Sequence, residues 1–239
     1  MIDSPRLSTA HDGLIDAVGM AAGGIEAASL TSHWPVVGAA FGHGILAVGQ
    51  AVYGWIPDWS PAQAQSASGR AAILADTKAT LADRADPMDW IAGHRVEHSP
   101  FWQTVHGVAD ALDPRTSRPW YSRIAWANLY PVAPNDVKGN PTGLLRDVQT
   151  VPAAAVLDAV IEVLEPRLVL VLAGPFIWPL VGSLRLGLLD RQPAPLTLAG
   201  RRDGGSWLCG MHPGGAQRRG WPARAYAAHI VERVGDLDL

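Results

Sequence analysis

Short apolar runs alternate along the chain with longer segments in which apolar residues recur at helical spacing. The short runs end at glycine or polar turn residues, which is typical of buried strands. The predicted strands are 44–48, 124–127, 168–173 and 206–209. The predicted helices are 13–31, 70–84, a segment that starts at Pro100, 152–165 and 221–234. Strands alternating with helices predict an α/β fold, here a three-layer α/β/α sandwich with a mainly parallel central sheet.

Proline and serine mark where two of these helices begin or end. Ser99 followed by Pro100 is typical of an N-cap with proline at the first helical position. Pro166 closes the helix predicted at 152–165. The intervening segments are predicted as a surface loop (54–69), a long proline-rich loop (129–141) and a helical hairpin (176–205).

The composition favours one folded domain over residues 1–239. Of the 239 residues, 48% are apolar and 17% are charged, which provides for a sizeable core. No linker, repeat or low-complexity tract divides the chain. We therefore expect a single domain, with the first ~35 residues as a helical extension.

The charge balance limits the kinds of partner. Lys and Arg (19) against Asp and Glu (22) give a net charge of −3, so the chain as a whole is not a polycation. A nucleic-acid site must then be a local basic patch. The most apolar stretch, 168–182, contains two prolines and is shorter than the ~20 residues that cross a bilayer. We expect no membrane association, and a monomer.

The single cysteine, Cys209, excludes an intrachain disulfide, a multi-cysteine zinc site and an iron–sulfur cluster. One buried thiol fits a reducing compartment, so we expect a cytoplasmic protein. We also expect neither a metal ion nor another cofactor.

Three predicted strands are followed by loops with distinctive polar residues. Gln50, Asn128 and His212 each lie just after a strand, although 78 and 84 residues separate them along the chain. In open α/β sheets, ligands bind beyond the carboxyl ends of the strands. Two amides and an imidazole suit a planar ligand whose edge mixes donors and acceptors, and a nucleobase is such a ligand.

These loops and their order resemble the uracil-DNA glycosylase superfamily. The first motif of that family has the form Gly-Gln-Asp-Pro-Tyr, and residues 49–53 are Gly-Gln-Ala-Val-Tyr. Its last motif begins His-Pro-Ser, and residues 212–215 are His-Pro-Gly-Gly. Between them the family has a strand that ends in an asparagine, which Asn128 matches. The resemblance covers the chain from about residue 40 onward and implies the fold of that family.

The resemblance implies that a nucleotide is flipped out of the DNA and that the bond between its base and sugar is cleaved. His212 would stabilise the negative charge that develops on a base oxygen, and Asn128 would recognise the base edge. Gln50 would bind the base from the other side, and Tyr53 would crowd position 5 of a pyrimidine. The base-binding set implied in this way is Gly49, Gln50, Ala51, Tyr53 and Asn128.

The sequence departs from the family at three places. Ala51 replaces the aspartate that activates water, and Val52 replaces the proline after it. Asp58 is a candidate replacement carboxylate, and a simple turn before Trp59 is the alternative explanation of that residue. Gly214 and Gly215 stand where small hydroxyl residues are more usual, which predicts a flexible loop that approaches its ligand closely.

A basic cluster accompanies the last motif. Residues 201–224 contain five arginines and one aspartate, a local charge of +4 in a mildly acidic chain. The cluster predicts a phosphate-contacting surface, although a solvated arginine-rich loop explains the charge equally well. The predicted DNA-contacting residues are Gly214, Gly215, Gln217, Arg218 and Arg219.

The leading prediction is a monofunctional DNA glycosylase that removes uracil or a modified pyrimidine. It would act in base-excision repair or in defence against phages with modified DNA. The motifs contain no lysine, so lyase activity through a Schiff base is not expected. The alternative is a catalytically inactive nucleic-acid-binding module on the same fold. Serine-hydrolase and nucleotide triphosphatase functions are disfavoured because the sequence lacks Gly-x-Ser-x-Gly and the phosphate-binding loop Gly-x-x-x-x-Gly-Lys-Ser/Thr.

Overall fold

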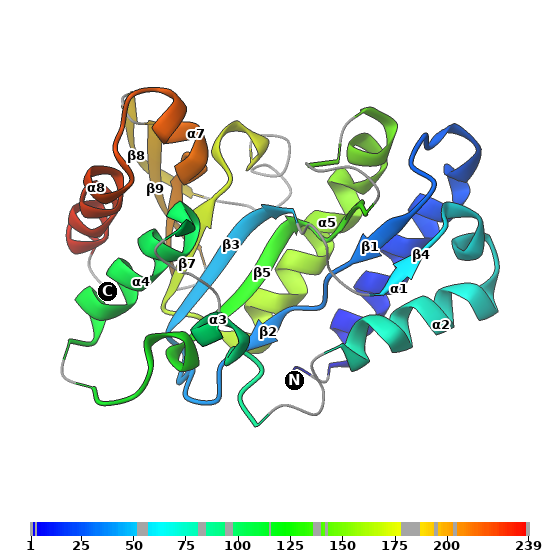
Figure 1. Ribbon diagram of the computed structural model, residues 1–239, viewed down its shortest axis with the longest axis horizontal. Coiled ribbons are helices and arrows are strands. Elements are labelled where there is room, and N and C mark those ends of the chain that lie inside the picture. The colour runs from blue at the N-terminus through cyan, green and yellow to red at the C-terminus, as the bar shows by residue number, and fades with distance from the viewer. Residues whose placement is uncertain are drawn as a thin grey trace.

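The computed structural model describes residues 2, 4–51, 57–80, 85–93, 98–114, 116–135, 140–141, 143–177, 187–193, 196–202 and 205–237. A seven-stranded sheet forms the centre, in the order β2-β5-β3-β7-β10-β9-β8 (Figure 1). Its strands are β2 (Val36–Val37), β3 (Ile45–Ala51), β5 (Ile124–Tyr130), β7 (Leu168–Leu172), β8 (Gly187–Pro193), β9 (Leu196–Arg202) and β10 (Gly205–Gly210). The four neighbours β5, β3, β7 and β10 are parallel, and the outer strands are antiparallel. The predicted α/β fold with a mostly parallel central sheet is confirmed.

The parallel strands are buried on both faces because helices cover both sides of the sheet. Every residue of β5 and β7 is buried, as the continuous apolar runs predict. The main helices are α1 (Pro5–Met20), α4 (Pro100–Leu112), α5 (Gly143–Leu164) and α8 (Ala223–Gly235). Alternate residues of β3 enter two separate cores: Leu46 and Val48 face α1 and α5, and Ile45 and Ala47 face α4 and α8. In Figure 1, α5 passes behind β3 and β5.

A small antiparallel sheet lies beside the central one. Its order is β4-β1-β6, from β1 (Leu30–Ser32), β4 (Asp58–Trp59) and β6 (Val132–Pro134). The other helices among the described residues are α2 (Ala67–Ala79), α3 (Trp90–Gly93) and α7 (Pro213–Arg218), with 3₁₀ turns at Ala22–Gly24, Pro61–Gln65, Trp120–Arg123 and Gly174–Ile177. Among the described helices, none combines the length and the apolar composition that crossing a membrane requires.

Caps explain where two helices begin. The Ser99 hydroxyl accepts the backbone N–H of Trp102, and Pro100 occupies the first helical position, as predicted. The same Ser-Pro pair occurs at Ser4 and Pro5, where α1 begins. The helix predicted at 13–31 is therefore misplaced, because α1 ends at Met20 and the chain continues through a 3₁₀ turn into β1.

Three other predicted segments are wrong in type. The described part of the loop predicted at 54–69 contains β4, a 3₁₀ turn and the start of α2, and Trp59 is buried with its Nε1–H donating to Ser32. The loop predicted at 129–141 contains the end of β5 and all of β6. Within 176–205, β8 and β9 form a β-hairpin rather than a helical one. They are strands because they extend the sheet from β10, a long-range pairing that local periodicity does not indicate.

Candidate functional site

The carboxyl ends of the four parallel strands meet at one edge of the sheet. The strand order reverses at β3, which lies between β5, the next parallel strand in the chain, and β7, the one after it. Ligands of open α/β sheets bind at such a reversal. Gln50 is the penultimate residue of β3, Asn128 lies near the end of β5, and His212 follows β10. The structure therefore brings together the strand ends that the sequence pointed to.

The Asn128 side chain is buried beside Gly49, its partner on β3. The residue is 4% exposed and pairs in register with Gly49. A Cβ atom at position 49 would lie 2.8 Å from Asn128 Oδ1 and 3.7 Å from the Phe101 ring, so glycine leaves the space that the amide occupies. Within the described part of the chain, Asn128 Nδ2 has no hydrogen-bond partner. A buried amide nitrogen without an acceptor costs about 1–3 kcal/mol, so this donor is suited to a bound ligand.

His212 is held in one orientation by the helix that it caps. Its Nδ1 accepts the backbone N–H of Gly214 at 3.2 Å, which makes His212 the N-cap of α7. Because Nδ1 is an acceptor, the neutral imidazole has its proton on Nε2. Burial, and secondarily the nearby charge of Arg218, lower the pKa of His212. The ring is therefore a neutral hydrogen-bond donor through Nε2 at neutral pH.

The chain before His212 is fixed from both sides. The buried Tyr226 hydroxyl of α8 donates to the Met211 carbonyl at 2.7 Å. A Cβ at Gly210 would lie 2.6 Å from that hydroxyl oxygen, so the close approach requires glycine. Gly174, at a φ of +61° shortly after β7, lies beside the same stretch, and a Cβ there would lie 3.5 Å from the His212 backbone nitrogen. Tyr226 and the two glycines thus fit the backbone that leads to His212 closely against its neighbours.

Phe101 completes this group, and the sequence analysis did not identify it. Its ring lies in the first turn of α4, nearly parallel to the His212 ring, with an angle of 18° and centroids 6.5 Å apart. It also packs edge-on against the buried Trp102, with centroids 4.8 Å apart. The Ser99–Pro100 cap locates this helix start in the sequence, but only the tertiary structure places the ring over Gly49. We call Gly49, Phe101, Asn128 and His212 the strand-end cluster.

The Gln50 side chain forms its hydrogen bonds within the protein. Its Nε2 donates to the Ala173 carbonyl at 2.8 Å, and its Oε1 accepts from Asn140 Nδ2 at 2.9 Å. Successive strand residues point to opposite faces, so the Gln50 side chain points away from the face that Gly49 and Asn128 share. Asn140, within the loop predicted at 129–141, is a partner that the sequence analysis did not identify. The structure therefore separates the Gln50 amide from the strand-end cluster.

The other predicted base-binding residues are distributed differently. Ala51 ends β3 opposite Tyr130, whereas Val52 and Tyr53 lie outside the described residues. Asp58 is exposed in β4 of the small sheet, where it accepts a hydrogen bond from the Ser29 hydroxyl. This hydrogen bond ties the carboxylate to the small sheet, and its contacts with described residues include none with the strand-end cluster.

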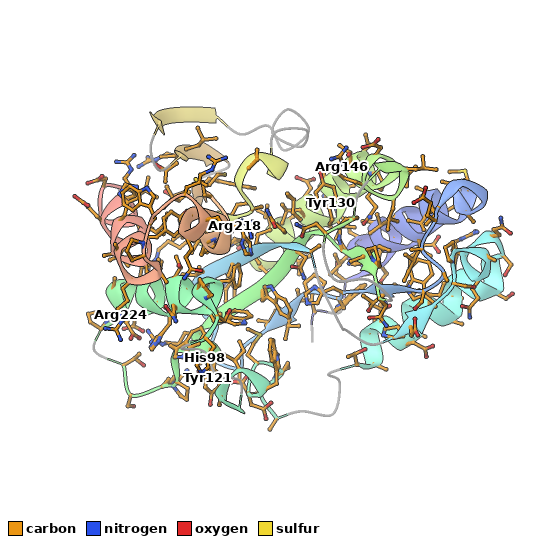
Figure 2. All side chains as sticks on the ribbon, turned by 45° about the horizontal axis from the view of Figure 1, so that its top comes forward. His98, Tyr121, Tyr130, Arg146, Arg218 and Arg224 are labelled. Carbon is orange, nitrogen blue, oxygen red and sulfur yellow. The ribbon has the colours of Figure 1, made fainter. Side chains whose placement is uncertain are left out.

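The predicted flexible loop after His212 is instead a helix. Gly214 and Gly215 form the first turn of α7, because His212 caps that turn and Pro213 occupies its first position. Gln217, Arg218 and Arg219 are exposed at its end. Figure 2 shows Arg218 at the edge formed by the strand ends, with Tyr130 and Arg146 further toward α5.

The donor set of the cluster is neutral. It offers the Asn128 amide N–H and the His212 Nε2–H beside an aromatic ring, and its contacts with other described residues include no carboxylate. Across the described residues, no three His, Cys, Asp or Glu side chains gather to hold a metal ion. The arrangement is suited to a planar ligand with carbonyl oxygens on its edge.

The sequence matches no model of a known protein family and no curated protein.

Proposed function

We propose that the protein is a DNA glycosylase with a uracil-DNA glycosylase-like fold, which flips out and hydrolytically removes uracil or a modified pyrimidine. The observation that carries the proposal is the buried Asn128 Nδ2, which has no partner in the described part of the chain. It lies beside a glycine, an aromatic ring and a neutral histidine donor at the ligand-binding edge of the sheet. The motif resemblance at residues 49–53, 128 and 212–215 supports the same assignment.

The geometry suggests how each group would act. The bond between sugar C1′ and the base nitrogen breaks with its electron pair moving to the base, which leaves an oxocarbenium-like sugar. His212 Nε2–H donates to a base oxygen as negative charge develops there, and the Asn128 amide donates to the base edge. Phe101 offers a face on which the base stacks. Water then adds to C1′ and loses a proton to solvent, and the base anion takes up a proton from solvent, which yields the neutral free base and an abasic site.

The arginines of α7 would position the DNA. Arg218 and Arg219 are exposed next to His212 and are suited to phosphate oxygens, which carry no sequence information. Because these contacts are electrostatic, binding should weaken as salt rises. Recognition of the base then depends on the strand-end cluster, and the substrate is selected by what fits beside Phe101 and Asn128.

One observation favours a second candidate, a binding module without catalysis. The contacts of the strand-end cluster with described residues include no carboxylate, and Asp58 is held by Ser29. A glycosylase without a water-activating carboxylate must rely on stabilising the departing base alone. If that is insufficient, the same cluster would bind a flipped base without releasing it.

Base release distinguishes the two candidates. The purified protein is incubated with DNA containing uracil, mismatched thymine or 5-hydroxymethyluracil, and with phage genomes that contain modified pyrimidines, and abasic sites are detected by alkaline cleavage. We expect release that falls by about 10² or more in His212→Ala and Asn128→Ala. His106→Ala, an exposed histidine on α4, is the matched control and should retain full activity. DNA binding without abasic sites on any of these DNAs would reject the enzyme and leave the binding module. The responding DNA would distinguish repair from defence.

A further inference from the structure

A cavity of about 530 Å³ lies at the opposite edge of the sheet, where the parallel strands begin. Its walls come from the loop before β3, the end of α4, and the residues that precede β5 and β7. Phe41 and Leu112 supply apolar surface, and His43, Asp113, Arg123 and Arg167 supply the polar groups. This volume is within the range of about 300–1,000 Å³ that is typical of small-molecule sites.

The loop that forms one wall is tied to its neighbours. The Arg167 backbone N–H donates to the His43 carbonyl at 2.9 Å, and that of Leu168 donates to the Gly44 carbonyl at 3.3 Å. His43 Nδ1–H donates to the Leu164 carbonyl at 3.0 Å. A Cβ at Gly44 would lie 2.8 Å from the Arg123 carbonyl oxygen, so the loop packs directly on the start of β5. The cavity is therefore built into the fold.

The two arginines that line the cavity, Arg123 and Arg167, differ in their partners. The Arg123 side chain is 10% exposed and donates to the carbonyls of Ala109 and Asp113 and to the Asp110 carboxylate. It closes the carboxyl end of α4, and its charge is balanced there. Arg167 is exposed, and within the described residues it forms no ion pair. Its guanidinium is available to a ligand.

Backbone N–H groups of the same loop offer further hydrogen-bond donors beside Arg167. Gly42 and His43 have φ angles of +51° and +57°, and their N–H groups donate to no acceptor among the described residues. Both residues line the cavity, in a turn that the Gly44 N–H closes by donating to the Phe41 carbonyl at 2.9 Å. Arg167 and these amides thus supply donors next to the apolar surfaces of Phe41 and Leu112.

We infer that this cavity binds a small organic oxyanion, a carboxylate or phosphate group attached to an apolar body. The oxyanion contacts Arg167 and the Gly42–His43 amides, and the apolar body packs on Phe41 and Leu112. The inference is independent of the proposed glycosylase function, because the cavity lies at the opposite ends of the strands.

Ligand-observed NMR and calorimetry test the inference with benzoate, phenyl phosphate, inorganic phosphate and the neutral analogue benzyl alcohol. We expect benzoate or phenyl phosphate to bind with a Kd below about 1 mM, and benzyl alcohol to bind about tenfold more weakly or worse. The stronger of the two anions identifies the preferred headgroup. Inorganic phosphate binding as tightly as phenyl phosphate would overturn the role of the apolar walls.

Two variants locate the binding. Arg167→Gln removes the guanidinium and Ala40→Leu fills the cavity, and each should weaken binding by about tenfold or more while thermal unfolding stays as in the parent. Arg118→Gln, an exposed arginine elsewhere, is the matched control. His212→Ala should leave the affinity unchanged, which separates this site from the strand-end cluster. Absence of binding by both organic anions at about 10 mM, or affinity unchanged in both cavity variants, would refute the inference.

Discussion

Acidification should destabilise the protein through two buried histidines. His11 of α1 and His33 after β1 are both almost fully buried, and their rings pack against Trp34 and Trp126 with centroids 4.6 and 4.2 Å apart. Burial lowers the pKa of each to about 3, with a smaller contribution from Lys78 at His11 and from His11 at His33. Both imidazoles are therefore neutral in the folded protein from neutral pH down to well below pH 6.

The magnitude follows from the difference between folded and unfolded pKa values. An unfolded histidine titrates near 6.5, so the unfolded state binds more protons once the pH falls below about 6.5. Stability is full above that pH and declines as the pH falls toward the folded pKa of about 3. Each histidine costs about 1.4 kcal/mol per pH unit in that window, or roughly 2–3 kcal/mol at pH 4.5. Together they would remove about 5 kcal/mol, a large part of the stability of an ordinary domain.

Urea unfolding followed by tryptophan fluorescence at about pH 7, 5.5 and 4.5 measures this effect. His11→Gln combined with His33→Gln is the test variant, and the change in unfolding free energy with pH, rather than its absolute value, is compared. We expect the loss between pH 7 and 4.5 to fall to about 2 kcal/mol or less in the variant. His98→Gln, at an exposed position, should leave the parent profile intact. A parent whose unfolding free energy is constant to about pH 4.5 would refute the reasoning, as would a variant with an unchanged slope.

The remaining predictions concern the strand-end cluster and its supports. Gly49→Ala places a Cβ 2.8 Å from Asn128 Oδ1, so base release should fall by about 10² with little change in Tm, and unchanged release would contradict this geometry. Tyr226→Phe leaves the Met211 carbonyl without its donor and should lower the unfolding free energy by about 1–3 kcal/mol in urea titrations; an unchanged value would show that the carbonyl finds another donor. Replacing Arg218 and Arg219 with Gln should reduce the slope of log affinity for DNA against log salt by about 2, and an unchanged slope would exclude both from phosphate contact.

Local patterns predicted the elements whose formation depends on nearby residues. The continuous apolar run of β7 and the Ser99–Pro100 cap of α4 indicated a buried strand and a helix start, and both are confirmed. The helical hairpin predicted at 176–205 was wrong because β8 and β9 extend the sheet from β10, a pairing that their own periodicity does not indicate. The helix predicted at 152–165 begins too late, because α5 starts at Gly143 and contains Pro152. Proline disfavours a helix interior, but packing of α5 on the core outweighs that local preference.

At the candidate site, the sequence likewise predicted which residues lie there but not which partners they contact. The order of strands and polar residues predicted that Gln50, Asn128 and His212 would reach one edge of the sheet, and they do. It did not predict which of them remain free to bind a ligand. Gln50 donates to Ala173 and accepts from Asn140, so its amide links the end of β3 to the end of β7. Asn128 has a buried nitrogen with no acceptor in the described part of the chain, and His212 has its Nδ1 occupied by Gly214. A ligand at this edge therefore meets two donors, the Asn128 amide and His212 Nε2–H, while Gln50 maintains the spacing of the strands on either side of the reversal.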